Sequence, residues 1–512
     1  MVLLSIDPNG NEYCIPDKND TRIEIKKIKN IIAENKKSGK KIVVVQGLGF
    51  VGAVMAAVCA DCEINGKMPY FVIGVDLPSQ NSFWKISVIN KGKSPFKSSD
   101  SEVEKIFKRT TKVKKTLITT WVPEAYSEAD IVIIDINLDV IKTEIGKAES
   151  ATVEIKSFEK AIHTIGKHLR PHTLLLIETT VPPGTTENIV KPIIEKCFVT
   201  RGIDISKNQP LIAHSYERVM PGDNYISSIK KMWRTFSATN KDAAQKTRKF
   251  LSSIIDTENY PLWELPEPVA SEMAKILENS YRAMNISFIH EWTLYAEDVG
   301  INLFEVIDSI RVRKGTHDNM MYPGFGVGGY CLTKDPLLGE WASKNIFHRE
   351  KHLDFSVKAV NVNDLMPRHT FDLLMKGMGN DIKNKKITIF GASYRRDIDD
   401  SRNSPTIMLY DDIKRAGAIP QIHDPYTKII LNRKDIKITS NLDSALDGAS
   451  GVIFAVKHRE YEDLPMKKVI SKVNNNGCII DAFDVLTNEK IVRLKNNGFK
   501  VLGVGKGHIK YL

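Results

Sequence analysis

Residues 41–52 read KIVVVQGLGFVG, and this stretch decides the fold of the first half of the chain. A short apolar run leads into glycines spaced as GxGxxG, and an apolar segment of helix length follows. Such glycines allow a tight turn, the close approach of a pyrophosphate and the packing of helix on strand. Phosphates would lie at the helix N-terminus, where unpaired amides favour anions. The pattern predicts a dinucleotide-binding turn whose cofactor contacts come from Gly47, Gly49, Phe50, Val51 and Gly52.

An acidic residue follows the next apolar run, Phe71–Val75. At this position Asp76 would accept hydrogen bonds from the ribose hydroxyls and repel a 2′-phosphate. The alternative is an ordinary acid at the end of a strand. Because Asp76 comes with the complete glycine pattern, we predict that the cofactor is NAD and not NADP.

Apolar runs of strand length alternate with helix-length segments in both halves of the chain, which is typical of parallel sheets covered by helices on both faces. Between them, Pro268–Gly300 has helical spacing, with a proline at its start and a glycine at its end. We predict an α/β fold with two doubly wound Rossmann-like domains joined by a long central helix. The expected divisions are an N-terminal extension at 1–40, to which the pattern assigns no role, an NAD-binding domain at 41–260, a central helical domain at 261–370 and a C-terminal Rossmann-like domain at 371–512.

Composition narrows the classes of function. Lys and Arg exceed Asp and Glu by 73 − 62 = 11, but they are spread along the 512 residues, which favours a solvated surface over nucleic-acid binding. No apolar run approaches the length of a membrane span and no secretory signal is visible, so we expect a cytoplasmic protein that does not contact membranes. The six cysteines are scattered, and we expect mostly free thiols; Cys59 and Cys62 suit packing better than a metal site, and no metal is predicted.

A second glycine-rich segment, residues 324–335, reads GFGVGGYCLTKD. Cys331 can attack a carbonyl carbon as a thiolate, which the cation Lys334 would favour, and the Asp335 carboxylate can assist proton transfer to water. On the predicted central helix, Lys275 and Asn279 are four residues apart and share a face, where they could stabilise an oxyanion. Taken singly, each has a simpler explanation: a structural cysteine, a solvated lysine or a surface asparagine.

Taken in order, these segments resemble the UDP-glucose/GDP-mannose dehydrogenase family. The resemblance runs from about Lys41 to the C-terminus. It rests on Gly47–Gly52, Glu178–Gly184, Glu217-Arg218, Lys275 with Asn279, Gly328–Cys331 with Asp335, and Asp400–Pro405.

The resemblance implies an oxidation of the sugar C6 alcohol in two steps that consume two NAD. An aldehyde forms first, Cys331 captures it as a thiohemiacetal, and a second hydride transfer gives a thioester that water hydrolyses. Lys275 and Asn279 would stabilise oxyanions, Asp335 would help activate water or Cys331, Thr180 would hold water beside the nicotinamide, and Glu217 would assist acid–base chemistry or contact substrate. Lys334 and Arg402 would lie near the cofactor. Substrate contacts are implied for Glu217, Lys275, Asn279, Tyr322, Phe325, Gly328 and Arg395.

The resemblance also implies a homodimer or higher homo-oligomer formed through the central region, and an acidic sugar product of the kind used in surface polysaccharides. Four positions depart from the family pattern. The family has a proline where this chain has Tyr216, and the proline of a Thr-Pro pair where it has Asn137. It has a lysine in place of Arg395 and a glutamate in place of Asn403. The turn at Gly391–Arg395 lacks the second and third glycines but carries a cation, which suits a diphosphate better than a second NAD.

The substrate is predicted from two segments. The Gly326–Gly329 run and the Glu217-Arg218…Pro221-Gly222 segment look more like family members acting on UDP-N-acetylglucosamine or UDP-N-acetylmannosamine. UDP-glucose 6-dehydrogenase and GDP-mannose dehydrogenase are the alternatives within the family. A non-catalytic protein that binds NAD or nucleotide sugars is an alternative of another class, although retention of Cys331, Lys275, Asn279 and Asp335 argues against it.

Overall fold

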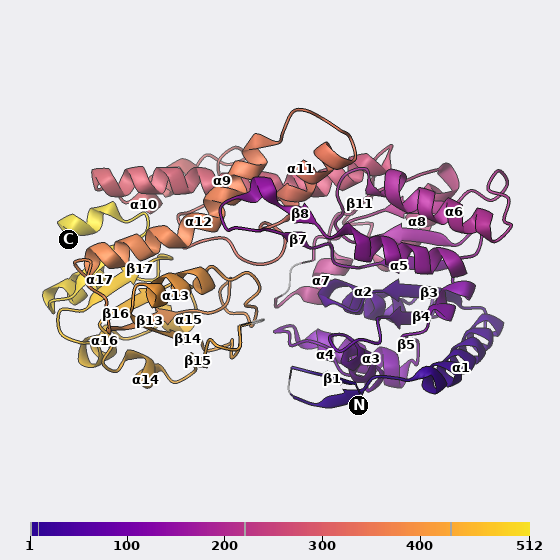
Figure 1. The fold of residues 1–512 in the computed structure, drawn as a ribbon, viewed down its shortest axis with the longest axis horizontal. Helices are drawn as coiled ribbons and strands as arrows, with labels where there is room; N and C mark the ends of the chain where they lie inside the picture. Colours follow the sequence, from indigo (N-terminus) through magenta and orange to yellow (C-terminus); the bar gives the residue numbers. More distant parts are fainter. Residues whose placement is uncertain (1–2, 9, 220–221, 431–432) are drawn as a thin grey trace. The chain divides into compact units, whose positions relative to one another are not determined.

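The structure is a computed structural model that describes residues 3–8, 10–219, 222–430 and 433–512 (Figure 1). It divides into two compact units, each built on its own sheet. Unit one comprises Met1–Ile141, Val153–Ile276 and Trp341–Glu350. Unit two comprises Lys142–Thr152, Leu277–Glu340 and Lys351–Leu512.

The sheet of unit one has the strand order β12-β11-β10-β9-β6-β3-β4-β5 and is parallel except between β10 and β11. From β5 to β10 this is the 3-2-1-4-5-6 order of a dinucleotide-binding Rossmann fold. The strands are β3 (Lys41–Gln46), β4 (Tyr70–Val75), β5 (Leu117–Thr120), β6 (Ile131–Ile134), β9 (Leu174–Ile177), β10 (Leu211–His214), β11 (Thr235–Ala238) and β12 (Trp263–Glu264).

Alternate side chains of each central strand enter two separate cores. In β3, Val43 and Val45 enter one core while Ile42 and Val44 enter the other. The first core packs against α2 (Phe50–Asp61), α3 (Phe83–Asn90), α4 (Ser101–Lys108), α7 (Tyr225–Lys230) and α8 (Lys241–Ile254). The second packs against α1 (Lys18–Lys37), α5 (Ile155–His168) and α6 (Lys191–Thr200). Burial on both faces explains why these strands are continuously apolar in sequence.

Unit two repeats the arrangement with the order β15-β14-β13-β16-β17-β18, parallel throughout, so both predicted doubly wound sheets are confirmed. Its strands are β13 (Lys386–Phe390), β14 (Ile419–His423), β15 (Ile438–Thr439), β16 (Gly451–Phe454), β17 (Cys478–Asp481) and β18 (Lys500–Gly503). One face packs on α12 (Asp354–Gly377) and α13 (Pro405–Arg415). The other packs on α14 (Leu442–Leu446), α15 (Arg459–Glu462), α16 (Met466–Lys472) and α17 (Asn488–Asn496).

The predicted central helix is confirmed as α9 (Pro268–Val299), a single helix of 32 residues. Proline suits the first turn because its fixed φ is helical and its missing N–H has no partner there. Gly300 follows the helix with φ +81°, the left-handed conformation that commonly ends helices. In the described parts of the chain, no helix combines the length and apolar character needed to cross a bilayer.

The other α-helices and β-strands of the described residues are short. They are α10 (Leu303–Arg311), α11 (Asp335–Asn345), the pair β7 (Val140–Ile141) and β8 (Thr152–Val153), and an N-terminal hairpin of β1 (Leu4–Ile6) and β2 (Glu12–Cys14).

Candidate active site

The first part of the candidate site is the glycine turn between β3 and α2. Gly47 has φ +97°, and a Cβ there would lie 2.3 Å from the carbonyl oxygen of Asp135, while a Cβ on Gly52 would lie 2.0 Å from the carbonyl oxygen of Gly47. Gly49 is the N-cap of α2 and makes no side-chain cap. A Cβ on Gly49 would meet no protein atom within 4 Å, so the chain's own packing gives no reason for a glycine there. A pyrophosphate approaching the N-terminus of α2 supplies that reason, and the turn therefore fits NAD.

Asp76 lies at the end of β4, beside this turn. Its carboxylate accepts hydrogen bonds from the Leu48 amide at 3.2 Å and the Leu77 amide at 2.8 Å. Lys85 Nζ is 3.4 Å from Asp76 Oδ2. The acid therefore sits at the position from which it can bind a ribose, with a cation beside it.

We expect Asp76→Ala to raise the KM for NAD about tenfold or more, because hydrogen bonds to a charged group contribute roughly 1.5–3 kcal/mol. The substitution also removes the charge that repels a 2′-phosphate and leaves Lys85 to attract it, so use of NADP should improve. Steady-state kinetics with each cofactor measure both effects. Asp204→Ala, at an exposed acid elsewhere in unit one, is the control, and equal behaviour of the two variants would make Asp76 a structural residue.

A buried charge cluster lies at the carboxyl ends of β6 and β9. Asp135 and Glu178 each follow one of two paired residues of these strands, Ile134 and Ile177, so their side chains are neighbours. Arg234 donates a hydrogen bond of 2.5 Å to Glu178, and both members of this ion pair are buried. Burial, and then the charge of Glu178, raise the pKa of Asp135 well above its usual value. Asp135 therefore lies beside a buried ion pair, in a setting that favours its protonated form.

Thr180 follows Glu178 and is half-buried. The turn after it is tied to α9 by Glu272, whose carboxylate accepts hydrogen bonds from the Gly184 amide at 2.6 Å and the Thr186 amide at 2.8 Å. Burial raises the pKa of Glu272 to about 7 despite these bonds. Sequence reasoning missed Glu272, although it precedes Lys275 by three residues and so shares its face of the helix.

Lys275 is directed to the segment that follows β10. Its Nζ donates to the carbonyl oxygen of Glu217 at 2.9 Å and lies 5.4 Å from the ring centroid of Tyr216. The guanidinium of Arg218 lies 5.0 Å from the same ring. Tyr216, where the family pattern has proline, thus lies close to two cations. Pro221, from the same sequence segment, lies outside the described residues.

Unit two places Cys331 four residues before the start of α11. The carbonyl of Cys331 accepts from the amides of Lys334 at 3.1 Å and Asp335 at 2.8 Å, and Cys331 itself is exposed. The buried carboxylate of Asp335 accepts from Asn279 Nδ2 at 2.6 Å and pairs with Lys334 Nζ at 2.8 Å. The structure therefore brings an amide, a cation and a carboxylate together in the turn that follows the exposed Cys331.

The glycines before Cys331 are required by close packing. A Cβ on Gly328 would lie 2.4 Å from the Cβ of Tyr394, and one on Gly329, which has φ +80°, would lie 2.8 Å from the Tyr394 ring. Gly329 N donates to the Arg402 carbonyl at 2.9 Å, and Asn403 Nδ2 donates to the Gly329 carbonyl at 2.9 Å. The segment that carries Cys331 is thus held against residues 394–403.

Three further predicted residues occupy different environments. Arg402 is paired with Asp400 at 2.6 Å, which raises the pKa of Arg402 although burial works to lower it. Phe325 is 1% exposed and its side chain belongs to a hydrophobic core, so its ring is not directed to a ligand. Tyr322 is exposed and donates a hydrogen bond to Asp308, which raises the pKa of Tyr322.

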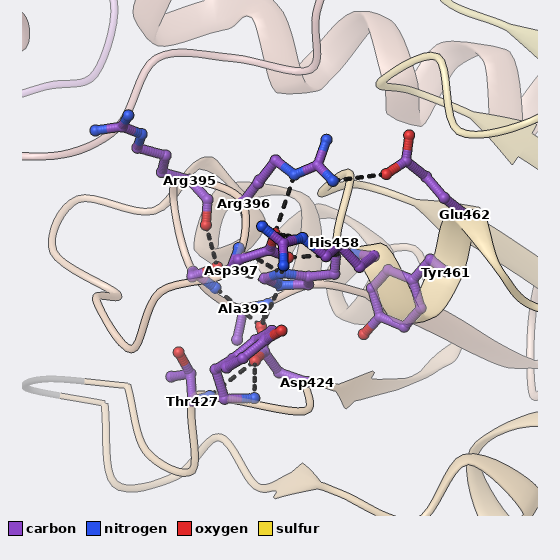
Figure 2. A network of polar contacts seen from close by, with 12 residues as sticks. Ala392, Arg395, Arg396, Asp397, Asp424, Thr427, His458, Tyr461 and Glu462 are labelled. Carbon is purple, nitrogen blue, oxygen red and sulfur yellow. Dashed lines mark hydrogen bonds and ion pairs between the residues drawn. The ribbon is translucent and has the colours of Figure 1, made fainter. Parts of the chain in front are cut away.

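In unit two, backbone amides of the turn that begins at Gly391 are hydrogen-bonded to a carboxylate of the protein itself (Figure 2). Asp424, at the end of β14, accepts from the amides of Ala392 at 2.7 Å and Thr427 at 2.7 Å and from His458 Nε2 at 3.2 Å. Burial raises the pKa of Asp424, but the His458 contact and the amides outweigh it and hold the pKa below its usual value. Figure 2 shows the Arg395 guanidinium directed away from this network. Because the turn amides are occupied, a diphosphate would depend on a side chain such as Arg395.

Comparison with known proteins agrees with this geometry. Three domain models of the UDP-glucose/GDP-mannose dehydrogenase family match: the NAD binding domain at residues 40–249, the central domain at 269–364 and the UDP binding domain at 388–488. A UDP-N-acetyl-D-mannosamine dehydrogenase of Methanocaldococcus jannaschii is 29% identical over 92% of this chain and 97% of its own. The crystal structure of an NDP-N-acetyl-D-galactosaminuronic acid dehydrogenase from Methanosarcina mazei is 27% identical, with a TM-score of 0.75, over 94% of this chain and 99% of that one. A UDP-glucose 6-dehydrogenase of Rickettsia prowazekii is 24% identical over 90% of this chain and 98% of its own.

Proposed function

Because the chain belongs to the UDP-glucose/GDP-mannose dehydrogenase family, and is thus an NAD-dependent nucleotide-sugar dehydrogenase, we propose that it oxidises UDP-N-acetylmannosamine to the corresponding uronate. The observation that carries the chemistry is the exposed Cys331 beside the Asn279–Asp335–Lys334 contacts. The choice of sugar is supported by the name of the relative from Methanocaldococcus jannaschii and by the Gly326–Gly329 run.

The proposed reaction needs two hydride transfers and one covalent capture. NAD, which the glycine turn and Asp76 would hold, would supply the hydride acceptor; loss of the C6 hydride to it and of the hydroxyl proton to a base would give an aldehyde. The Cys331 thiolate adds to the aldehyde carbon, and protonation of the oxygen gives a thiohemiacetal. A second NAD, taken up in exchange for the first NADH, would accept the hydride from the thiohemiacetal carbon, and loss of the hydroxyl proton would give a thioester. Water then adds to the thioester carbonyl and the C–S bond breaks, which releases the carboxylic acid and regenerates the thiol.

The residues of α9 and α11 suit the oxygen and proton steps. The Lys275 ammonium can stabilise the negative oxygen that develops at C6, as can the second amide hydrogen of Asn279. Asp335 is held as a carboxylate acceptor by Asn279 and Lys334, and such a group can orient and deprotonate the water that hydrolyses the thioester. Glu217 and Thr180 complete the proposed set, with Arg395 and Tyr322 as candidates for the nucleotide sugar.

Kinetics with four nucleotide sugars test the proposed substrate. We expect kcat/KM to be highest for UDP-N-acetylmannosamine, ahead of UDP-N-acetylglucosamine, UDP-glucose and GDP-mannose. A preference for UDP-glucose would overturn the sugar assignment while keeping the chemistry. No NADH from any of them, with NAD still bound, would favour the non-catalytic binding protein.

We also propose that α9 pairs with a second copy of the chain. Exposed apolar side chains recur along it every three or four residues, and a continuous exposed apolar stripe of this kind marks an interaction surface. They are Leu277, Tyr281, Met284, Phe288, Trp292, Tyr295 and Val299.

Sedimentation should give a multiple of the 57.6 kDa chain mass, and Phe288→Glu should shift the protein towards monomer; a monomeric wild-type protein would contradict the pairing. None of the six cysteines is in a disulfide, which suits a reducing compartment, and we place the enzyme in the cytoplasm.

A further inference from the structure

The N-terminal extension lies before the part of the chain that matches the family, which begins at residue 40. Its described residues nevertheless pack closely on the rest of unit one. Ile28 and Ile32 of α1 are buried in one core of the sheet, and the β1–β2 hairpin contacts α3 (Figure 1). Because α3 follows β4, the hairpin lies against the segment that leads away from Asp76.

The side chain of Ser5 connects the hairpin to the loop between β4 and α3. Ser5 of β1 is fully buried, and its hydroxyl donates to the carbonyl oxygen of Gln80 at 2.8 Å. The same hydroxyl accepts from the amide of Trp84 at 3.1 Å. Gln80 lies in the loop between β4 and α3, and Trp84 lies in the first turn of α3. A single hydroxyl thus satisfies one backbone acceptor and one backbone donor of this loop, and burial makes both bonds costly to lose.

The other end of the loop is fixed by Asp76. Leu77 N donates to the Asp76 carboxylate, and the Ser82 hydroxyl donates to the Leu77 carbonyl at 2.7 Å. Lys85, one residue beyond Trp84 on α3, reaches back to Asp76 Oδ2. The position of the Asp76–Lys85 pair therefore depends on where the loop and the start of α3 are held, and Ser5 holds both.

Other side-chain contacts stabilise the hairpin itself. Asp7 is buried, and its carboxylate accepts from the Asn11 amide at 2.9 Å and from Asn11 Nδ2 at 2.8 Å. On the second strand, Tyr13 packs against the core that contains α3, and Lys91 Nζ lies 5.2 Å from its ring centroid. These contacts keep β1 in place, so Ser5 is presented to the loop from a fixed strand.

We propose that the N-terminal hairpin is a positioning element for the adenosine end of NAD. Ser5 fixes the Gln80–Trp84 loop, and through it Asp76 and Lys85 are set for the ribose. The proposal rests on the assignment of Asp76 to the cofactor. It gives the β1–β2 hairpin a role in cofactor affinity that the nucleotide-sugar and covalent steps do not share.

Ser5→Ala tests this role against a purely structural one. The KM and Kd for NAD should rise about fivefold, which corresponds to the roughly 1 kcal/mol typical of a buried hydrogen bond. At saturating NAD, kcat and the KM for the sugar should keep their wild-type values. Ser38→Ala is the matched control: it removes the hydroxyl of the residue that caps the C-terminal end of α1, which donates to Asn35 O at 2.7 Å. An unchanged affinity for NAD in Ser5→Ala, or an equal change in Ser38→Ala, would overturn the proposal.

Hydrogen exchange on the wild-type protein gives a second measurement that does not depend on how the variant folds. NAD should slow exchange in the 76–84 loop and also in β1 and β2, while the end of α1 near Ser38 stays unchanged. Slower exchange in the loop alone would show that the hairpin is not coupled to cofactor binding. Absence of any NAD binding by wild-type protein would instead contradict the proposed function, so the two failures are distinguishable.

Discussion

Cys331→Ser is expected to lower the rate of uronate formation by about a thousandfold or more, the scale seen when a nucleophile is removed from a covalent mechanism. A serine hydroxyl is a far weaker nucleophile than a thiolate, so the aldehyde is no longer captured for the second hydride transfer. NAD binding should be unchanged, because the glycine turn and Asp76 are untouched. Product analysis should find aldehyde and at most one NADH per sugar.

Cys197→Ser is the control for this variant. Cys197 lies on α6, and its Sγ is 3.8 Å from His163 Nδ1, a polar neighbour that tolerates a hydroxyl. The Cys197→Ser variant should make uronate at the wild-type rate. Undiminished acid formation by Cys331→Ser would remove the covalent step from the mechanism.

Arg234→Met is expected to reduce the free energy of unfolding by about 3–5 kcal/mol, because removing one partner of a buried ion pair leaves the other without compensation. Glu178 would remain buried, with Asp135 as its neighbour and without the cation that now pairs with it. Chemical denaturation followed by circular dichroism measures the loss.

The matched control is Arg248→Met, which breaks an ion pair with Glu264 on the surface of unit one. Exposed pairs contribute little, so this variant should lose at most about 1 kcal/mol. A small loss for Arg234→Met, comparable with that of the control, would show that the Glu178 site adapts by taking up a proton.

The sequence predicted the parts of the fold whose signals are local. The strands before Gly47 and Gly391 are buried on both faces and therefore read as apolar runs, and the helix from Pro268 carries its own start and stop signals. The short strands β11 and β12 were not predicted, because Thr235–Ala238 and Trp263–Glu264 lack a long apolar run. They belong to the sheet through pairing with distant strands.

In the candidate site, too, the residues with local sequence signals were predicted and those that depend on distant partners were not. Lys334 and Asp335 are close to Cys331 in sequence and remain close in the structure. Arg234 has the appearance of a surface arginine in a lysine-rich stretch, and only Glu178, 56 positions away, makes it a buried ion-pair partner. Phe325 was predicted beside the nucleotide sugar, but the sequence cannot show that its ring enters the core. Ser5 carries no local signal, because both of its partners are backbone groups more than 70 residues away.

The stoichiometry of NADH per sugar tests the central claim most directly. Limiting UDP-N-acetylmannosamine is incubated with excess NAD until the absorbance of NADH stops rising, and the product is identified by mass spectrometry. Two NADH and a uronic acid for each sugar consumed are predicted. One NADH with a free aldehyde as the final product would contradict the covalent four-electron oxidation.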